Sequence, residues 1–225
     1  MSLTRRSLGR GAWTGTPISA SLGWTTCGPP ESSTRSRPRG TGPWSPSYSF
    51  GGRDLQLPLS EPDHSNASHG LVRWAARSLS ERTGDAVVLC HRLMAQPGYP
   101  WALELEVRYR LCGAGLVVTQ SATNRGESAA PYASGAHPYL TAGAGPADGR
   151  TWVHLHGEHA VSLWADARHG WLQLFTADDV GEASRRSLAV EPMTAPADAF
   201  RSGDGLTVLA PGERFEASWG VTAGG

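Results

Sequence analysis

Apolar and polar residues alternate at every second position in the segment Ala102–Leu111. From position 103 its odd-numbered residues are Leu, Leu, Val, Tyr and Leu, whereas the even-numbered residues from 104 are Glu, Glu, Arg and Arg. This alternation predicts a strand with one buried and one solvated face. The turn Cys112–Gly115 and the apolar return Leu116–Thr123 predict that the strand continues into a hairpin.

Shorter segments of the same kind follow one another along the chain from Tyr48. A Gly-Gly pair divides Tyr48–Leu59 and predicts a second hairpin. Further strands are expected at Val87–Leu93, Trp152–His156, Ala160–Ala165, Trp171–Thr176, Leu206–Leu209 and Phe215–Val221. Many strands separated by Gly and Pro turns, with few helical signals, indicate an all-β antiparallel sandwich or barrel.

The N-terminal part of the chain lacks this pattern. Its run Pro29–Gly42 contains no Val, Ile, Leu, Phe or Met, so it cannot bury enough apolar area to offset the entropy lost on ordering. We therefore expect an atypical segment over residues 1–45, disordered or not native-like, and one β-sandwich domain over residues 46–225. The Ser-, Thr-, Arg- and Pro-rich composition of the first segment resembles an out-of-frame translation of a GC-rich gene, which resequencing would test.

Composition narrows the classes of partner. Lys+Arg and Asp+Glu balance at 20 each, so there is no electrostatic reason to expect nucleic acid or an anionic membrane as a partner. No apolar run reaches the ~20 residues that a membrane helix needs. The scattered Cys27, Cys90 and Cys112 argue against a disulfide framework and favour a reducing compartment, which we take to be the cytoplasm.

Three polar residues have flanking sequences that favour a functional role. His69 lies in the polar segment SNASHGLVRW, and His137 precedes a proline that biases its backbone toward an extended conformation. Glu191 ends a short apolar run before Pro192, where partly apolar surroundings would raise the pKa of a carboxylate, as a general base requires. Taken singly, each pattern is more typical of an ordinary loop or strand-end residue.

Together these segments resemble the aldose 1-epimerase (galactose mutarotase) family from about Tyr48 to the C-terminus. The resemblance rests on FGGRDLQLPLSEPDHSNASHGLVRW around His69, on the His-Pro-Tyr-Leu motif from His137, on the Glu-Pro…Pro-Asp-Ala motif from Glu191, and on the turn Leu209–Glu213. It implies a galactose mutarotase-like β-sandwich, or supersandwich. It also implies exchange of the α and β anomers of a free hexose such as glucose or galactose, with neither metal nor redox cofactor, by a monomer or homodimer.

The resemblance assigns roles to five residues. Glu191 would remove the proton from the anomeric hydroxyl, and His137 would donate a proton to the ring oxygen. His69 would hold the sugar, and Arg73 and Trp74 would line the same site.

Two family features are missing from this chain. No Arg follows Pro43-Trp44, where relatives carry an Asn-Arg pair that contacts sugar hydroxyls. Only Leu140–Ala160 separates the His137 motif from the later strands, and the join near Asp148–Arg150 looks like an internal deletion that removes a sugar-binding Asp. Asp166 is expected to be a turn residue and not its replacement. We therefore expect a sandwich that is incomplete relative to the family, with weak or absent activity.

Other functions remain open on the sequence. A hexose-phosphate 1-epimerase relative would need cations for the phosphate, and only Arg73 and Arg77 lie near the motifs. A non-catalytic carbohydrate-binding pseudoenzyme would not need Glu191. His154, His156 and His159 resemble a zinc site, but no carboxylate–histidine signature accompanies them, so a solvated strand end is expected. The absence of a G-x-S-x-G elbow argues against a serine hydrolase.

Overall fold

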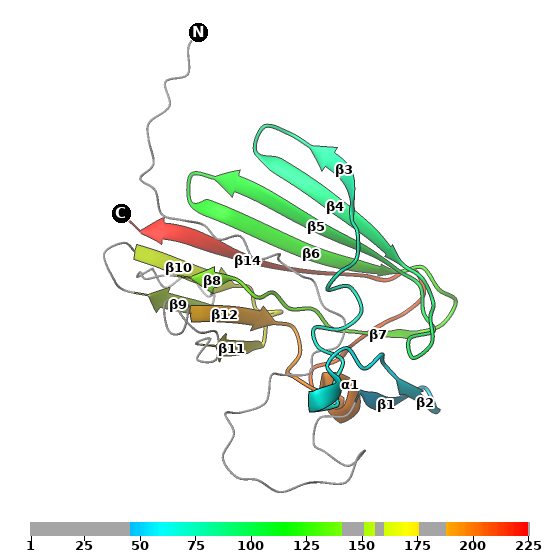
Figure 1. Cartoon of the computed structure of the whole chain (residues 1–225). Helices are drawn as coiled ribbons and strands as arrows, with labels where there is room; N and C mark the ends of the chain where they lie inside the picture. The colour runs from blue at the N-terminus through cyan, green and yellow to red at the C-terminus, as the bar shows by residue number, and fades with distance from the viewer. Residues whose placement is uncertain (1–45, 141–150, 156–159, 176–187, 225) are drawn as a thin grey trace, which may run out of the picture.

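The computed structural model describes residues 46–140, 151–155, 160–175 and 188–224 (Figure 1). These residues form mostly antiparallel strands, with one 3-10 turn, η1 (Pro62–His64), and one short helix, α1 (Ala199–Ser202). Within the same ranges, no helix has the length and apolar character needed to cross a membrane. The predicted segment 1–45 and the expected join near Asp148–Arg150 lie outside the described residues.

A seven-stranded sheet forms the larger layer (Figure 1). Its strands, in spatial order, are β3 (Ser78–Arg82), β4 (Ala86–Leu93), β5 (Leu103–Cys112), β6 (Gly115–Asn124), β14 (Arg214–Gly224), β10 (Ala160–Ala165) and β9 (Thr151–Leu155). The hairpin predicted from the alternating segment is confirmed, because β5 and β6 pair without a register shift from Leu103–Asn124 to Cys112–Gly115. The odd-numbered residues Leu103, Leu105 and Val107 of β5 are buried, as the pattern predicted, whereas Leu111 near the hairpin turn is exposed, contrary to the prediction.

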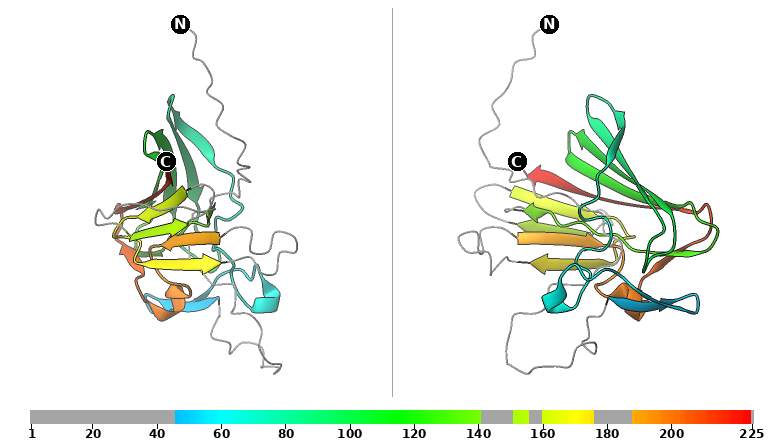
Figure 2. Two further views of the ribbon diagram at one scale, coloured as in Figure 1. Left: turned by 90° about the vertical axis from the view of Figure 1, so that its left-hand side faces the viewer. Right: turned by 45° about the vertical axis from the view of Figure 1, so that its right-hand side comes forward.

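A second sheet of three strands lies against one end of the large sheet (Figure 2). Its order is β11 (Trp171–Phe175), β12 (Leu188–Met193) and β8 (Tyr139–Leu140). Two further ribbons complete the described fold: β1 (Ser47–Phe50) pairs with β2 (Arg53–Gln56), and β13 (Thr207–Leu209) pairs with β7 (Ala130–Tyr132). The sheets stay open, so this is a sandwich and not a closed barrel.

The predicted strands are confirmed to within a few residues, whereas β3, β7, β8 and β12 were not predicted. All five residues of the edge strand β3 are exposed, so β3 has no buried face to produce an alternating pattern. β7 and β8 have only three and two residues. The expectation that Glu191 lies at a strand end was wrong: it lies inside β12, whose residues are nearly all buried.

Two clusters of buried side chains hold the layers together. One lies between the two sheets and combines Val190 and Ala136 with Val118, Leu163 and Trp219 of the large sheet. The other joins the ends of β4–β6 to the β1–β2 ribbon, helix α1 and the loop before β3. Since side chains alternate along a strand, the residues of β12 on either side of Val190 point away from the first cluster. Glu191 is one of them.

Candidate active site

His137 and Glu191 are brought together by strand register. Tyr139 pairs with Ala189 in the antiparallel ladder of β8 and β12. Counting back two residues on one strand and forward two on the other places His137 directly opposite Glu191. Their side chains therefore emerge side by side on the same face of the sheet.

The backbone around this pair explains why the two side chains are so close. The N–H of Ala136 donates to the carbonyl of Pro192 at 3.1 Å, and the N–H of Val190 donates to the carbonyl of Pro138 at 3.0 Å. The residues between these two bonds form a non-hydrogen-bonded pair, which is the closer type in an antiparallel ladder, with Cα atoms ~4.5 Å apart. Pro138 and Pro192 have no N–H to donate. The pairs Ala136–Pro192 and Pro138–Val190 on either side are therefore each joined by one backbone hydrogen bond, where two are usual.

The Glu191 carboxylate is buried and has unused hydrogen-bonding capacity. Its side chain is 1% exposed, and its Oε1 lies 2.9 Å from Nε2 of His137, whose side chain is 18% exposed. The distance is that of an ion pair when His137 is protonated, and among the described residues neither carboxylate oxygen accepts a hydrogen bond. A buried acceptor of this kind is costly unless it is satisfied by a bound group.

His69 reaches the site from a tight turn. The N–H of Gly70 donates to the carbonyl of Ala67 at 3.2 Å, so His69 is the third residue of a four-residue turn. Its φ of 55° lies in the left-handed region, where such a turn favours Gly. A histidine kept in this backbone conformation points to a role for its side chain, because strained residues cluster at functional sites.

The three motif residues converge. The rings of His69 and His137 lie edge to face, with centroids 5.6 Å apart and planes at 76°. Burial, and then the charges of Arg73 and His137, lower the pKa of His69 to about 4, while Glu61 acts in the opposite direction. His69 is therefore a neutral imidazole at pH 7.

Arg73 and Trp74 lie close to His69 in the same loop. Nη1 of Arg73 donates to Oγ of Ser68 at 3.2 Å. The guanidinium carbon of Arg73 lies 4.9 Å from the centroid of the Trp74 ring. Trp74 is 80% exposed, so its ring is accessible to a ligand. The proposed contact of these two residues with a sugar stays a prediction.

The register also identifies a residue that the sequence reasoning missed. Gln173 of β11 pairs with Glu191, so Glu191 lies between His137 and Gln173 on one face. Phe175, two residues further along the same face, lies with its ring centroid 6.1 Å from that of His137. Gln173 offers an amide beside the carboxylate. No local motif marks it, because its position depends on the pairing of β11 with β12.

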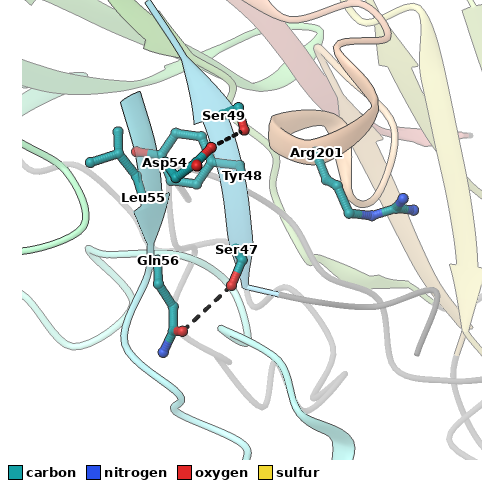
Figure 3. A pocket seen from close by; sticks show the side chains of 7 residues that line it. All are labelled: Ser47, Tyr48, Ser49, Asp54, Leu55, Gln56 and Arg201. Carbon is teal, nitrogen blue, oxygen red and sulfur yellow. Dashed lines mark hydrogen bonds between the residues drawn. The ribbon is translucent and has the colours of Figure 1, made fainter. Parts of the chain in front are cut away.

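A polar cavity elsewhere in the described residues lacks reactive groups. It has a volume of about 450 Å³ and is lined by Ser47, Tyr48, Ser49, Asp54, Leu55, Gln56 and Arg201 (Figure 3). Asp54 accepts a hydrogen bond from Ser49, and Arg201 pairs with Asp198. The lining contains no imidazole beside a carboxylate, and this part of the chain lies beside α1, away from β12 (Figure 1). This cavity therefore does not offer the imidazole–carboxylate pair that acid–base chemistry at a sugar would need.

The structure tests the prediction for Asp166 but not the one for the histidine cluster His154, His156 and His159. Asp166 follows β10 and accepts hydrogen bonds from the backbone N–H groups of Arg168 and Ser218, so its prediction as a turn residue is confirmed. His156 and His159 lie outside the described residues, which leaves the histidine cluster untested.

The fold and this site define the class of protein. The backbone is similar to a galactose mutarotase-like protein from Lactobacillus casei, with a TM-score of 0.63 and 17% identity over 80% of each chain. A galactose mutarotase-like protein from Clostridium acetobutylicum gives a TM-score of 0.63 at 12% identity, over 80% of this chain and 75% of that one. Galactose 1-epimerase from Lactobacillus acidophilus gives 0.55 at 15% identity, over 80% and 76%. The fold is thus a galactose mutarotase-like β-sandwich.

The sequence comparisons then give the family. The model of the aldose 1-epimerase family matches residues 42–154, and the chain belongs to that family. An uncharacterized Escherichia coli protein, YihR, is 28% identical over 220 residues, covering 74% of this chain and 70% of YihR. The alignment is 220 positions long, which is more than the 74% of this 225-residue chain that it covers. The alignment therefore contains positions at which YihR has a residue and this chain has none. The family match includes His69 and His137 but ends before Glu191, whose place therefore rests on geometry.

Proposed function

We propose that this chain is an aldose 1-epimerase that interconverts the α and β anomers of a free hexose. The observation that carries the proposal is the buried Glu191 carboxylate, 2.9 Å from His137 Nε2 and without an aligned hydrogen bond from the described residues. An acid and a base at such close range suit a hemiacetal, whose hydroxyl oxygen and ring oxygen are bonded to the same carbon.

The reaction follows from two proton transfers. Glu191 removes the proton from the anomeric hydroxyl as the bond between C1 and the ring oxygen breaks, and His137 gives its proton to the departing ring oxygen. The aldehyde rotates about the C1–C2 bond. On closure the former ring hydroxyl returns its proton to His137 while attacking C1, and Glu191 returns its proton to the new anomeric oxygen. Protons and electrons balance over the cycle, and each group contributes ~10²–10⁴-fold to the rate.

Neighbouring residues would hold the sugar in place. A neutral His69 can donate one hydrogen bond and accept another, which suits a sugar hydroxyl. Gln173 would bind a hydroxyl next to Glu191, and the exposed ring of Trp74 would stack on the apolar face of the pyranose.

Substrate binding is expected to be weak. The Arg and Asp that relatives use to hold sugar hydroxyls have no counterpart by motif in this sequence. Each missing hydrogen bond to a charged group costs about 1.5–3 kcal/mol. If this loss falls on binding, KM rises more than kcat falls.

Polarimetry on freshly dissolved α-D-glucose and α-D-galactose tests the proposal. We expect the chain to speed the approach to anomeric equilibrium above the buffer rate, but less than an intact family member. The Glu191→Gln variant should return the rate to that of buffer. A wild-type rate equal to buffer at the highest soluble protein concentration would reject catalysis.

Two alternatives are separated by the same samples. A carbohydrate-binding pseudoenzyme would bind sugar in calorimetry, with Glu191→Gln unchanged, and would show no rate. A hexose-phosphate 1-epimerase would prefer a hexose 6-phosphate. One observation favours a phosphorylated substrate, since Nη1 and Nη2 of Arg77 are buried without a hydrogen-bond partner. Arg77→Gln should then weaken turnover of the hexose 6-phosphate alone.

A cytoplasmic location and a monomeric or homodimeric state remain part of the proposal, and light scattering measures the oligomeric state.

A further inference from the structure

The segment that carries His137 lies at the edge of the small sheet. Among the described strands of that sheet β8 is an outer one, and it pairs with β12 on one side. Ser134, Ala136 and Pro138 all use backbone groups to bond to the chain at β12 and Thr194. Because these groups alternate in direction along an extended strand, the carbonyl of Gly135 points away from β12.

The backbone ladder that holds this segment is weak close to His137. Pro138 and Pro192 leave the pairs on either side with one backbone hydrogen bond each. Segments with few hydrogen bonds open more readily than the rest of a fold. A second attachment on the far side of the segment would therefore affect the position of His137.

Gln120 of the large sheet makes a contact on that far side. Its Nε2 donates to the carbonyl of Gly135 at 3.2 Å. Gln120 is 1% exposed and lies on the inner face of β6, where it pairs with Val107 and Ala217. The bond therefore joins the middle of the large sheet to a residue two positions before His137.

A glutamine is costly at this position. The Oε1 of Gln120 is buried and has no hydrogen-bond partner among the described residues, and an unsatisfied buried acceptor lowers the free energy of unfolding. Its neighbours across the sheet, Val107 and Ala217, are apolar and buried. A methionine of similar length would fill this space without that cost, so the advantage of a glutamine lies in its bond to Gly135.

We propose that Gln120 is a positioning residue, which ties the edge segment carrying His137 to the large sheet and so holds His137 opposite Glu191. Strand register sets which residues face each other, and Gln120 limits how far the edge segment moves away from β12. A displacement of about 1 Å can cost ~10²-fold in rate, so the loss of this one bond would reduce turnover. The effect on turnover rests on the proposed function, whereas the attachment itself does not.

Amide hydrogen exchange, followed by NMR in the full chain without sugar, tests the attachment. The amide of Ala136, which donates to the carbonyl of Pro192, reports on the edge segment. The amide of Asn124, which donates to the carbonyl of Glu213, reports on the large sheet. Comparing the two amides separates a local change from a loss of global stability.

Three variants are compared with the wild type. Gln120→Met removes the bond and keeps the length of the side chain. Gln120→His keeps a ring N–H at a similar distance from the backbone, so it can donate to Gly135. Thr119→Ala is the matched control, because it removes a hydrogen bond to Ser218 from the opposite face of the same strand.

In Gln120→Met we expect Ala136 to exchange about tenfold faster, as the loss of one hydrogen bond implies, while Asn124 stays within about twofold of the wild type. Gln120→His should restore most of the protection of Ala136, and Thr119→Ala should leave it unchanged. Unchanged exchange of Ala136, an equal acceleration of Ala136 and Asn124, or no rescue by Gln120→His overturns the inference. If Gln120→Met does not fold, Gln120→Asn gives the same test with the same expected result, because its amide is one methylene too short to reach Gly135.

Polarimetry adds a readout that a merely structural bond would not change. In Gln120→Met kcat should fall about 10–100-fold with KM within about twofold of the wild type, since His137 is the proposed acid and not the residue that holds the sugar. A merely structural bond would lower the folded fraction and leave kcat per folded molecule unchanged, and that result overturns the role in positioning. If the wild type shows no catalysis, the proposed function fails, and hydrogen exchange still decides whether Gln120 holds the segment.

Discussion

His137, two residues before β8, faces Glu191 of β12 as a non-hydrogen-bonded pair, with Nε2 and Oε1 2.9 Å apart. The residues lie 54 positions apart in the sequence, and the closeness of the two side chains comes from strand register alone. A slip of one residue would turn one of them to the opposite face. The proposed chemistry therefore depends on the pairing of β8 with β12.

Replacing Glu191 with Gln should separate activity from stability. The substitution removes the base, so mutarotation should fall by ~10²–10⁴-fold. It also removes a buried charge that has no aligned hydrogen bond, so the free energy of unfolding should rise by about 1 kcal/mol. Polarimetry and urea unfolding at pH 8 measure the two effects. Glu104→Gln, which breaks an exposed ion pair with Arg125, is the control and should leave both unchanged. A stability loss in Glu191→Gln would show that the carboxylate is structurally satisfied.

At position 69 a Gly variant should be more stable than an Ala variant, which is the reverse of the usual order. Both His69→Gly and His69→Ala remove the imidazole, but only Ala places a Cβ at a φ of 55°. Left-handed backbone costs a residue with a Cβ about 1–2 kcal/mol, partly offset by the greater flexibility of Gly in the unfolded chain. We expect His69→Gly to be the more stable by about 1 kcal/mol in chemical unfolding. If Ala is as stable as Gly, the turn does not have the left-handed conformation.

Stability should fall in mildly acidic solution because of His69. The fold lowers its pKa from 6.5 to about 4, so as the pH falls the unfolded chain takes up this proton first. The stabilising effect of a neutral His69 is complete above about pH 6.5 and is lost as the pH falls toward 4. Between pH 7 and pH 5 the loss should be about 1–2 kcal/mol.

The control for this effect is His69→Asn, a side chain that tolerates left-handed backbone and does not titrate. Urea unfolding of both proteins at pH 7 and pH 5 gives the comparison. His69→Asn should lose less stability than the wild type over this interval. Equal losses would assign the acid sensitivity to other groups.

Gln173→Glu should move the pH dependence of activity. The new carboxylate would lie beside Glu191 on the same face, and two adjacent carboxylates raise the pKa of one of them. Turnover at pH 7 should fall by about tenfold and recover as the pH rises and the base is deprotonated. The control is Gln56→Glu, an exposed change on β2 that should leave the pH–rate profile unchanged. A uniform loss of rate at every pH would indicate a steric effect instead.

The alternating pattern of apolar and polar residues was sufficient to predict most of the strands. β5 and β6 illustrate this best, because their alternation is local and the turn between them is short. The same reasoning failed for β3, whose five residues are exposed on a sheet edge, and for β12, where Glu191 interrupts an apolar run. Burial on both faces removes the alternation on which such predictions depend.

The candidate residues His69, His137 and Glu191 could be named from local motifs and from the resemblance to a family. Their convergence could not be, because it requires the pairing of β8 with β12 and the left-handed turn at His69. Gln173 shows most clearly what sequence motifs cannot predict. Its neighbours in the sequence form no motif, and only the pairing of β11 with β12 places it beside Glu191.

The sequence by itself thus determined most of the segments that are strands, the family that the chain resembles and the residue types that are available for acid–base chemistry, since these depend on local order and composition. Only the tertiary structure decided which of these residues touch, how deeply Glu191 is buried and which histidine stays neutral. Those properties arise from register, long-range packing and the electrostatic fields of residues that are distant in sequence.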